Sequence, residues 1–190
     1  MSVCWGGLID SAERVFKRIE HEAEERSLPA VGRKKGQLLE NFVIAYQPGS
    51  ILELGTLSGF SAIFMAQHLR KGKITCIEIS EENAGIARKN IKDAGLEHKI
   101  EILVGDAEKV LPELKQKFDL VFLDTEKEDY IKYLKLFEKN LFKGSVIIAD
   151  NVKKFKHKVK DYLDYVRNSA KYDSEYFEFG FDAVEVSFLR

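Results

Sequence analysis

The feature that most constrains the fold is an alternation of two hydrophobic periods along the middle of the chain. Short runs rich in Ile, Val, Leu and Phe are typical of strands. They are separated by stretches of about 12 residues in which apolar side chains recur at helical spacing. The strands are expected at 51–55, 74–79, 100–104, 118–123 and 145–149, and the helices between them at 59–70, 81–93, 107–116 and 128–141.

This alternation predicts an α/β fold, a mostly parallel sheet with helices on both faces. The short strands are apolar on both faces, as buried parallel strands are. Residues flanking Phe181-Asp182 predict an antiparallel pair at the end of the chain. Further helices are expected at 8–26, 34–46 and 155–169, and the last two strands at about 175–180 and 183–189.

Composition excludes several classes of protein. Lys plus Arg total 30 and Asp plus Glu 31, a net charge of −1, so no general footprint for nucleic acid or membrane is expected. No apolar run approaches the roughly 18 residues that span a bilayer, and the first residues lack the blocks of a signal peptide. Cys4 and Cys76 form neither a disulfide framework nor a metal-ligand pair by spacing. We therefore expect a cytoplasmic protein.

No repeat, low-complexity tract or linker interrupts the chain. We expect a single domain over residues 1–190, since about 150 residues is typical of one domain. Within it, residues 1–46 are expected to form N-terminal helices that cover the site, and residues 47–190 the α/β core.

Chemistry is expected at the carboxyl ends of the strands, because ligands of open parallel sheets bind there. All five predicted strand ends carry an acidic residue at or beside the end. An alternative is that these acidic residues stabilise the start of the helices that follow. This alternative accounts for any single one of them, but less well for all five together. The segments are Glu53 to Gly55, Glu78, Gly105-Asp106, Asp124 and Asp150-Asn151.

The loop after the first predicted strand is Gly55-Thr56-Leu57-Ser58-Gly59, a G-x-x-x-G sequence. It lacks the glycine by which a G-x-G-x-x-G turn lets backbone approach a pyrophosphate. Glu78 ends the second strand, where an acid accepts hydrogen bonds from both ribose hydroxyls. Together these features favour S-adenosylmethionine over NAD.

Asp124, Asp150 and Asn151 follow consecutive predicted strands, so their side chains can meet in space. Such an all-oxygen set suits a hard cation such as Mg²⁺, and the lack of His and Cys argues against zinc. The alternative is that Asp150-Asn151 is only a turn.

Lys127 lies three residues after Asp124. A bound cation nearby would disfavour its ammonium form, which would bring its pKa toward the range of a general base. The alternative is a solvated surface lysine.

The chain resembles the cation-dependent O-methyltransferases, above all the catechol O-methyltransferases and their bacterial and archaeal relatives. The resemblance is strong over about residues 8–152 and loose beyond them. The motifs L-E-L-G, L-D-x-x-K-x-x-Y and A-D-N occur in this order at matching intervals. The segments that carry it are VGRKKG (31–36), ILELGTLSGFSA (51–62), IEIS (77–80), VGDAEK (104–109), FLDTEKEDY (122–130) and IIADNV (147–152).

The resemblance implies a Rossmann-like class I methyltransferase fold with seven strands, the last one antiparallel. It implies S-adenosylmethionine and Mg²⁺ (or Mn²⁺) as cofactors and a small catechol-like acceptor with vicinal hydroxyls. It also implies a role for each matching residue. For the cofactor, these are the Val31 backbone and Ser61 at the methionine carboxylate, Glu53 and Gly55 in the cofactor loop, Glu78 at the ribose, Asp106, Ala107 and Glu108 by the adenine, and Asp124 beside the cofactor. The metal ligands implied are Asp124, Asp150 and Asn151. Lys127 is implied as the catalytic base, with Asp124 as a second catalytic residue.

The sequence departs from the family around the acceptor. Members with catechol activity carry bulky apolar residues around the ring, and the corresponding positions are Ser27, Glu126 and one near Phe155, the first two of them polar. The carboxylate that anchors the second catechol hydroxyl falls near Glu175 or Tyr176. The resemblance therefore supports the cofactor and the metal more firmly than the substrate.

Two other functions remain open at this point. A basic run at 153–160, with Phe155 and His157 among its lysines, fits either a solvated helix start or contact with tRNA, whose hydroxylated nucleoside would then be the acceptor. A non-catalytic nucleotide-binding module or an NAD-dependent oxidoreductase is the third interpretation, against which the loop and the Asp-Asp-Asn set argue. A homodimer is possible.

Overall fold

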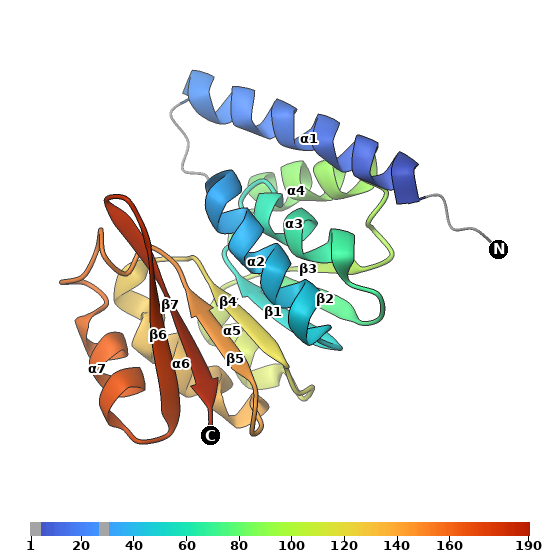
Figure 1. The fold of residues 1–190 in the computed structure, drawn as a ribbon. Helices are drawn as coiled ribbons and strands as arrows, with labels where there is room; N and C mark the ends of the chain where they lie inside the picture. The colour runs from blue at the N-terminus through green and yellow to red at the C-terminus, as the bar shows by residue number, and fades with distance from the viewer. Residues whose placement is uncertain (1–4, 27–30) are drawn as a thin grey trace.

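The computed structural model describes residues 5–26 and 31–190, which form a seven-stranded sheet with helices on both sides (Figure 1). The strand order is β3-β2-β1-β4-β5-β7-β6, and β7 is antiparallel to both of its neighbours. The predicted α/β class, with its antiparallel last strand, is confirmed. The strands are β1 Ser50–Leu54, β2 Lys73–Glu78, β3 Ile100–Val104, β4 Leu120–Leu123, β5 Val146–Ala149, β6 Tyr172–Phe179 and β7 Asp182–Leu189.

The central strands bury both faces. Along β1, Ile51 belongs to one hydrophobic core and Leu52 to the other, because successive side chains point to opposite sides of a strand. The helices α1 to α4 cover the first core and α5 to α7 the second (Figure 1). The helices are α1 Trp5–Arg26, α2 Gly32–Tyr46, α3 Phe60–His68, α4 Glu81–Asp93, α5 Ala107–Glu113, α6 Tyr130–Phe137 and α7 Lys160–Asn168.

Helix α1 lies across α3 and α4 at the outside of the first layer (Figure 1). Its buried face includes Ala12, Val15 and Phe16. The Phe16 ring stacks on Phe64 with the centroids 4.1 Å apart and meets the edge of Phe60 at 5.0 Å. Through these contacts α1 packs as part of the first hydrophobic core.

The helix predicted at 155–169 is wrong at its start, because residues 152–158 form successive turns and α7 begins at Lys160. The backbone N–H of Lys154 donates to Asp182, and that of Phe155 donates to Asn151 O. These bonds tie the segment to the ends of β5 and β7, so local helical periodicity is overridden. Val159, the residue before α7, is buried in the second hydrophobic core.

Other boundaries also differ from the prediction. Strand β6 begins at Tyr172 rather than at about 175, and the largest remaining differences among the helices are in α5 and α6. Helix α5 ends at Glu113 rather than at 116, where Leu114 is already extended and its N–H donates to Leu111 O. The helix expected at 128–141 is α6 flanked by two 3₁₀ turns, Lys127–Asp129 and Glu138–Asn140.

Over the described parts of the chain, no helix is both long and apolar enough to cross a membrane. Cys76 is a free thiol buried within β2. Cys4 lies outside the described residues.

We expect Phe16→Ala to lower the free energy of unfolding by about 3–5 kcal/mol, because it removes a buried ring from a tightly packed aromatic group. Urea unfolding followed by circular dichroism measures this. Lys17→Ala, one residue away on the solvent side of α1, is the matched control and should change the value by less than about 0.5 kcal/mol. Equal effects of the two substitutions would show that α1 does not belong to the cooperative core.

Candidate active site

The site lies at the carboxyl ends of β1, β2, β4 and β5, which end at the same edge of the sheet. Gly55 N donates to Ile77 O across β1 and β2, Asp124 N donates to Leu54 O across β4 and β1, and Asp150 N donates to Leu123 O across β5 and β4. These bonds continue the sheet one residue beyond the strands. They bring the predicted cofactor loop beside the predicted metal ligands.

Gly55 makes the first turn possible. Its φ is +88°, and a Cβ there would lie 2.2 Å from the backbone O of Asp124. No side chain fits such a contact, so only glycine allows β1 to end this close to β4. The approach of the two strands thus explains why position 55 is glycine, and its part in binding a cofactor stays a prediction.

Glu53 is fully buried below this loop. Its Oε1 accepts a hydrogen bond from Ser61 Oγ at 2.5 Å and its Oε2 one from Thr56 Oγ1 at 3.2 Å. Burial raises the pKa of Glu53 to about 7, against the effect of these hydrogen bonds, which favour the carboxylate. Ser61, predicted to hold the methionine carboxylate, here connects α3 to Glu53.

Glu78 orders the backbone of the cofactor loop. Its Oε2 accepts hydrogen bonds from the backbone N–H groups of Thr56 at 3.1 Å and Leu57 at 2.9 Å, and its Oε1 accepts one from Ser80 N at 2.9 Å. The side chain is buried. It therefore fixes the loop in addition to the predicted contact with a ribose, which stays a prediction.

The residues predicted beside the adenine follow β3, next to Glu78. Gly105 N donates to Glu78 O at 2.9 Å. Asp106 caps the start of α5 by accepting from Glu108 N, and Ala107 is the first residue of that helix. Glu108 forms an ion pair with Lys132 of α6. On the opposite side of the sheet, Val31 precedes α2 and packs against the first core.

The predicted metal ligands lie together at the ends of β4 and β5. Asp150 is almost completely buried. Burial and the neighbouring charge of Asp124 raise the pKa of Asp150 to about 6, while the Lys35 ammonium acts in the opposite direction. Asn151 has a φ of +60°, a left-handed conformation that asparagine tolerates better than most side chains do.

Two ammonium groups balance these carboxylates. Lys35 Nζ of α2 lies 2.5 Å from Asp150 Oδ1 and 2.7 Å from Asp182 Oδ2. Lys127 Nζ lies 2.7 Å from Asp124 Oδ1. These ion pairs offset the negative charge of Asp124, Asp150 and Asp182.

The donor set fits a hard divalent cation. Among residues 5–26 and 31–190, no group of three His, Cys, Asp or Glu side chains is arranged to hold a metal ion. The candidate set is instead two carboxylates and one amide oxygen, from Asp124, Asp150 and Asn151. A Mg²⁺ ion typically takes few protein oxygens and completes its coordination with water and substrate.

Lys127 is not a solvated surface lysine, since only 13% of its side chain is exposed. Besides Asp124, its Nζ lies 3.1 Å from Tyr130 Oη. The buried Tyr130 hydroxyl also lies 2.9 Å from Leu123 O and 3.1 Å from Asp150 O. Tyr130 therefore bridges the ends of β4 and β5 and holds Lys127 between them.

Three residues of this cluster had no predicted role. Lys35 and Tyr130 lie inside the motifs VGRKKG and FLDTEKEDY, which carry the family resemblance, so their place in those motifs was a usable signal. Asp182 was interpreted only as part of a hairpin turn. Its contact with Lys35 joins residues 147 positions apart, a separation that no local pattern reveals.

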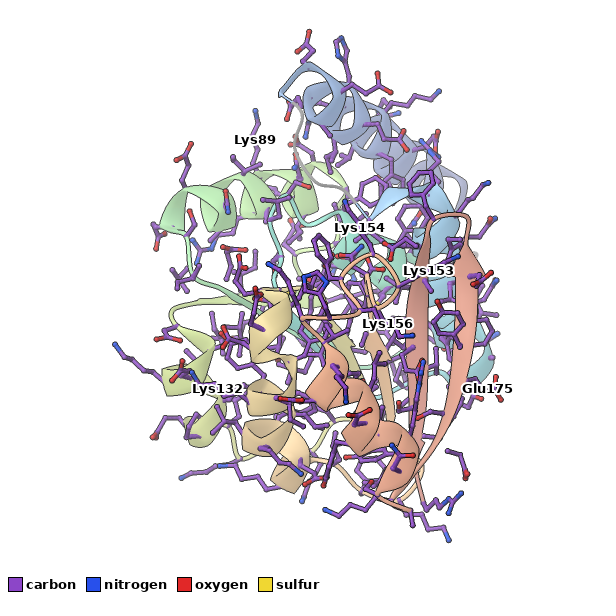
Figure 2. The ribbon with its side chains drawn as sticks, turned by 90° about the vertical axis from the view of Figure 1, so that its left-hand side faces the viewer. Lys89, Lys132, Lys153, Lys154, Lys156 and Glu175 are labelled. Carbon is purple, nitrogen blue, oxygen red and sulfur yellow. The ribbon has the colours of Figure 1, made fainter. Side chains whose placement is uncertain are left out.

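The predicted acceptor residues are more scattered. Glu126 is exposed and Phe155 half-buried, while Ser27 lies outside the described residues. Glu175 and Tyr176 lie within β6, two strands away from β5, rather than beyond the strand ends. Figure 2 shows Glu175 at the outer side of this strand, away from the labelled lysines of residues 153–156.

The basic run follows β5 as a series of turns, and Lys153, Lys154 and Lys156 gather on one loop in Figure 2. Lys153 pairs with Glu178 and Lys158 with Glu128. Lys154 and Lys156 are exposed. Lys160, at the end of the run, pairs with Asp164. The run thus lies beside the Asp150-Asn151 end of the site, with three of its lysines matched to carboxylates.

Comparison with known proteins decides the family, because the sequence model of the O-methyltransferase family matches residues 12–172. The chain belongs to the O-methyltransferase family. It is 39% identical over 175 residues to Catechol O-methyltransferase B of Danio rerio and 36% identical over 133 residues to Catechol O-methyltransferase of Mycobacterium tuberculosis. The alignments cover 87% and 69% of this chain but only 66% and 60% of those proteins, so the chain spans about two thirds of these curated relatives.

Solved structures of O-methyltransferases share the fold. The O-methyltransferase TomG of Streptomyces achromogenes, in complex with SAM, has a TM-score of 0.85 at 26% identity, with 92% of this chain and 89% of that chain covered. The O-methyltransferase of Bacillus cereus, in complex with SAH, has a TM-score of 0.84 at 25% identity, with 95% and 91% covered. The expected class I methyltransferase fold is confirmed.

Glu53 predicts a pH dependence of stability. Because its pKa is about 7 in the folded chain and 4.5 as the reference value, the unfolded chain releases this proton first. The free energy of unfolding therefore falls as the pH rises from about 4.5 to 7, by about 3 kcal/mol for this group.

Urea unfolding of the wild type and of Glu53→Gln, each at pH 5 and pH 8, measures this effect. The variant has no carboxylate to ionise, so its loss of stability between the two pH values should be smaller than that of the wild type. Equal losses would show that Glu53 ionises as readily in the folded chain as in the unfolded one.

Proposed function

We propose that this protein transfers a methyl group from S-adenosylmethionine to a hydroxyl group of a small catechol-like acceptor, with Mg²⁺ or Mn²⁺ as cofactor. The observation that carries the proposal is the meeting of Asp124, Asp150 and Asn151 at the strand ends, beside the loop of Gly55 and Glu78. Cofactor complexes of two relatives, one with SAM and one with SAH, support the choice of cofactor. Curated relatives named as catechol O-methyltransferases support the acceptor class.

In the proposed complex the cofactor lies across the ends of β1, β2 and β3. Glu78 binds the ribose hydroxyls, and its hydrogen bonds from the loop backbone maintain the conformation of the loop after Gly55. Asp106, Ala107 and Glu108 border the adenine. The Val31 backbone and Ser61 hold the methionine end, and the buried Glu53 positions Ser61 by accepting a hydrogen bond from its Oγ.

Methyl transfer requires an acceptor oxygen that is deprotonated and aligned with the sulfonium carbon. A divalent cation, when bound, lowers the pKa of the hydroxyl that it chelates and fixes the orientation of the acceptor. Asp124, Asp150 and Asn151 hold that cation. With the cation bound beside it, the ammonium form of Lys127 would be disfavoured, so that Lys127 first releases its proton to solvent and then, as the neutral amine, accepts the proton of the acceptor hydroxyl. Tyr130 and Asp124 hold its Nζ in place.

The acceptor extends beyond a bare catechol ring. The exposed Glu126 at the proposed mouth gives a small flat ring little apolar area to bury, and burial of such area is the main source of its affinity. The exposed Lys154 and Lys156 beside Asn151 offer positive charge to a polar or anionic part of the acceptor. Simple catechol is therefore a slow substrate compared with a larger hydroxylated one.

Metal dependence is the first test. Methyl transfer from labelled S-adenosylmethionine to a panel of catechols and hydroxylated phenylpropanoid esters should stop with excess chelator and return with Mg²⁺ or Mn²⁺. Asp150→Ala should abolish the transfer while leaving the circular dichroism spectrum unchanged. Full activity in excess chelator would contradict the proposed metal site.

Lys127→Met should lower turnover by about 10²–10⁴-fold, the usual contribution of a general base. Binding of S-adenosylmethionine, measured by calorimetry, should change little. Lys135→Met, which removes a lysine of α6 that pairs with Glu138 and not with Asp124, is the control for lost charge. If both variants keep the same pH profile as the wild type, Lys127 is not the base.

A further inference from the structure

Asp182, the first residue of β7, lies in the same cluster as the proposed metal ligands although it is 31 residues beyond Asn151. Its Oδ2 accepts hydrogen bonds from Lys35 Nζ at 2.7 Å and from Asn151 Nδ2 at 2.6 Å. Its Oδ1 accepts from the backbone N–H groups of Lys154 at 3.2 Å and Ala183 at 2.8 Å. The side chain is buried, and each of its oxygens faces two donors.

These contacts determine which way the Asn151 amide points. A carboxylate can only accept hydrogen bonds, so the Nδ2 of Asn151 must face Asp182 and its carbonyl Oδ1 must face away. The adjacent Asp150 is fixed in a related way, because its Oδ1 accepts from Lys35 Nζ at 2.5 Å and from Asn151 N at 2.7 Å. What remains for a cation is Asp150 Oδ2 and Asn151 Oδ1.

We propose that Asp182 is the positioning residue of the metal site, which orients Asn151 so that its carbonyl oxygen faces the cation. This inference rests on the proposed function, since it assumes that Asn151 is a ligand. Groups that hydrogen-bond to metal ligands orient them, and their loss typically weakens metal binding by about 10–100-fold. Asp182 does this from β7, so the antiparallel last strand contributes to a site otherwise built at parallel strand ends.

An amide cannot replace the carboxylate. In Asp182→Asn, the new NH₂ group faces either Lys35 and Asn151 or the two backbone N–H groups, and in both cases donors oppose donors. The Asn151 amide then loses the constraint that selects its orientation. If this variant does not fold, Asp182→Ala removes the acceptor with less conflict and tests the same point.

Binding of Mn²⁺, followed by the loss of the free-ion electron paramagnetic resonance signal, provides a measurement independent of catalysis. Asp182→Asn should weaken Mn²⁺ binding by about 10–100-fold, while S-adenosylmethionine affinity, measured by calorimetry, stays within about 2-fold. Asp173→Asn, which removes an exposed carboxylate of the same hairpin, is the matched control and should leave Mn²⁺ binding unchanged.

A double-mutant cycle separates positioning from a general effect of charge or fold. If Asp182 acts through Asn151, then adding Asp182→Asn to Asn151→Ala should weaken Mn²⁺ binding no further. If the double variant instead loses the full additional factor, or if Asp182→Asn alone binds Mn²⁺ like the wild type, the positioning role is wrong.

The wild-type protein distinguishes this outcome from failure of the proposed function. Suppose that the wild type binds Mn²⁺ and its methyl transfer is sensitive to chelator, but Asp182→Asn binds Mn²⁺ as tightly as the wild type. This result would overturn the inference and leave the proposed function standing. A wild type that binds no Mn²⁺ and methylates in chelator would overturn the metal-dependent function, and the inference with it.

Discussion

The close approach of β1 and β4 at Gly55 is the constraint on which the site depends. With the backbone O of Asp124 only 2.2 Å from where a Cβ would be, no side chain can separate the predicted cofactor loop from Asp124. Glu78 then fixes the loop through two of its backbone N–H groups. A ligand that lies over Gly55 therefore comes close to the end of β4, which is the geometry that an in-line transfer between two bound molecules requires.

The second constraint is electrostatic. Asp124, Asp150 and Asp182 would repel one another in a largely buried cluster, and Lys35 and Lys127 offset that repulsion. Breaking a buried ion pair is costly because it leaves one charge uncompensated. The cluster also connects α2, β4, β5 and β7. The same ion pairs therefore hold together elements from both ends of the chain.

The sequence predicted what depends on local pattern. Periodicity located the strands, and because parallel strand ends share one edge, it also predicted that Asp124 and Asp150 would meet. It could not predict that residues 155–158 turn instead of forming a helix, because the bond from Lys154 N to Asp182 is a tertiary contact. For the same reason Asp182 was missed: its contacts with Lys35 and Asn151 depend on β7 pairing with β5, which brings a hairpin residue to a strand end.

We propose that Asp124, Asp150 and Asn151 bind a divalent cation beside the cofactor. A crystal structure of the protein with Mn²⁺ and S-adenosylhomocysteine, with data collected near the manganese absorption edge, tests it most directly. We expect one strong anomalous peak in bonding contact with oxygens of all three residues, and the nucleoside ribose against Glu78. An anomalous map without a peak at these residues, at a Mn²⁺ concentration that supports full methyl transfer, would rule out this metal site.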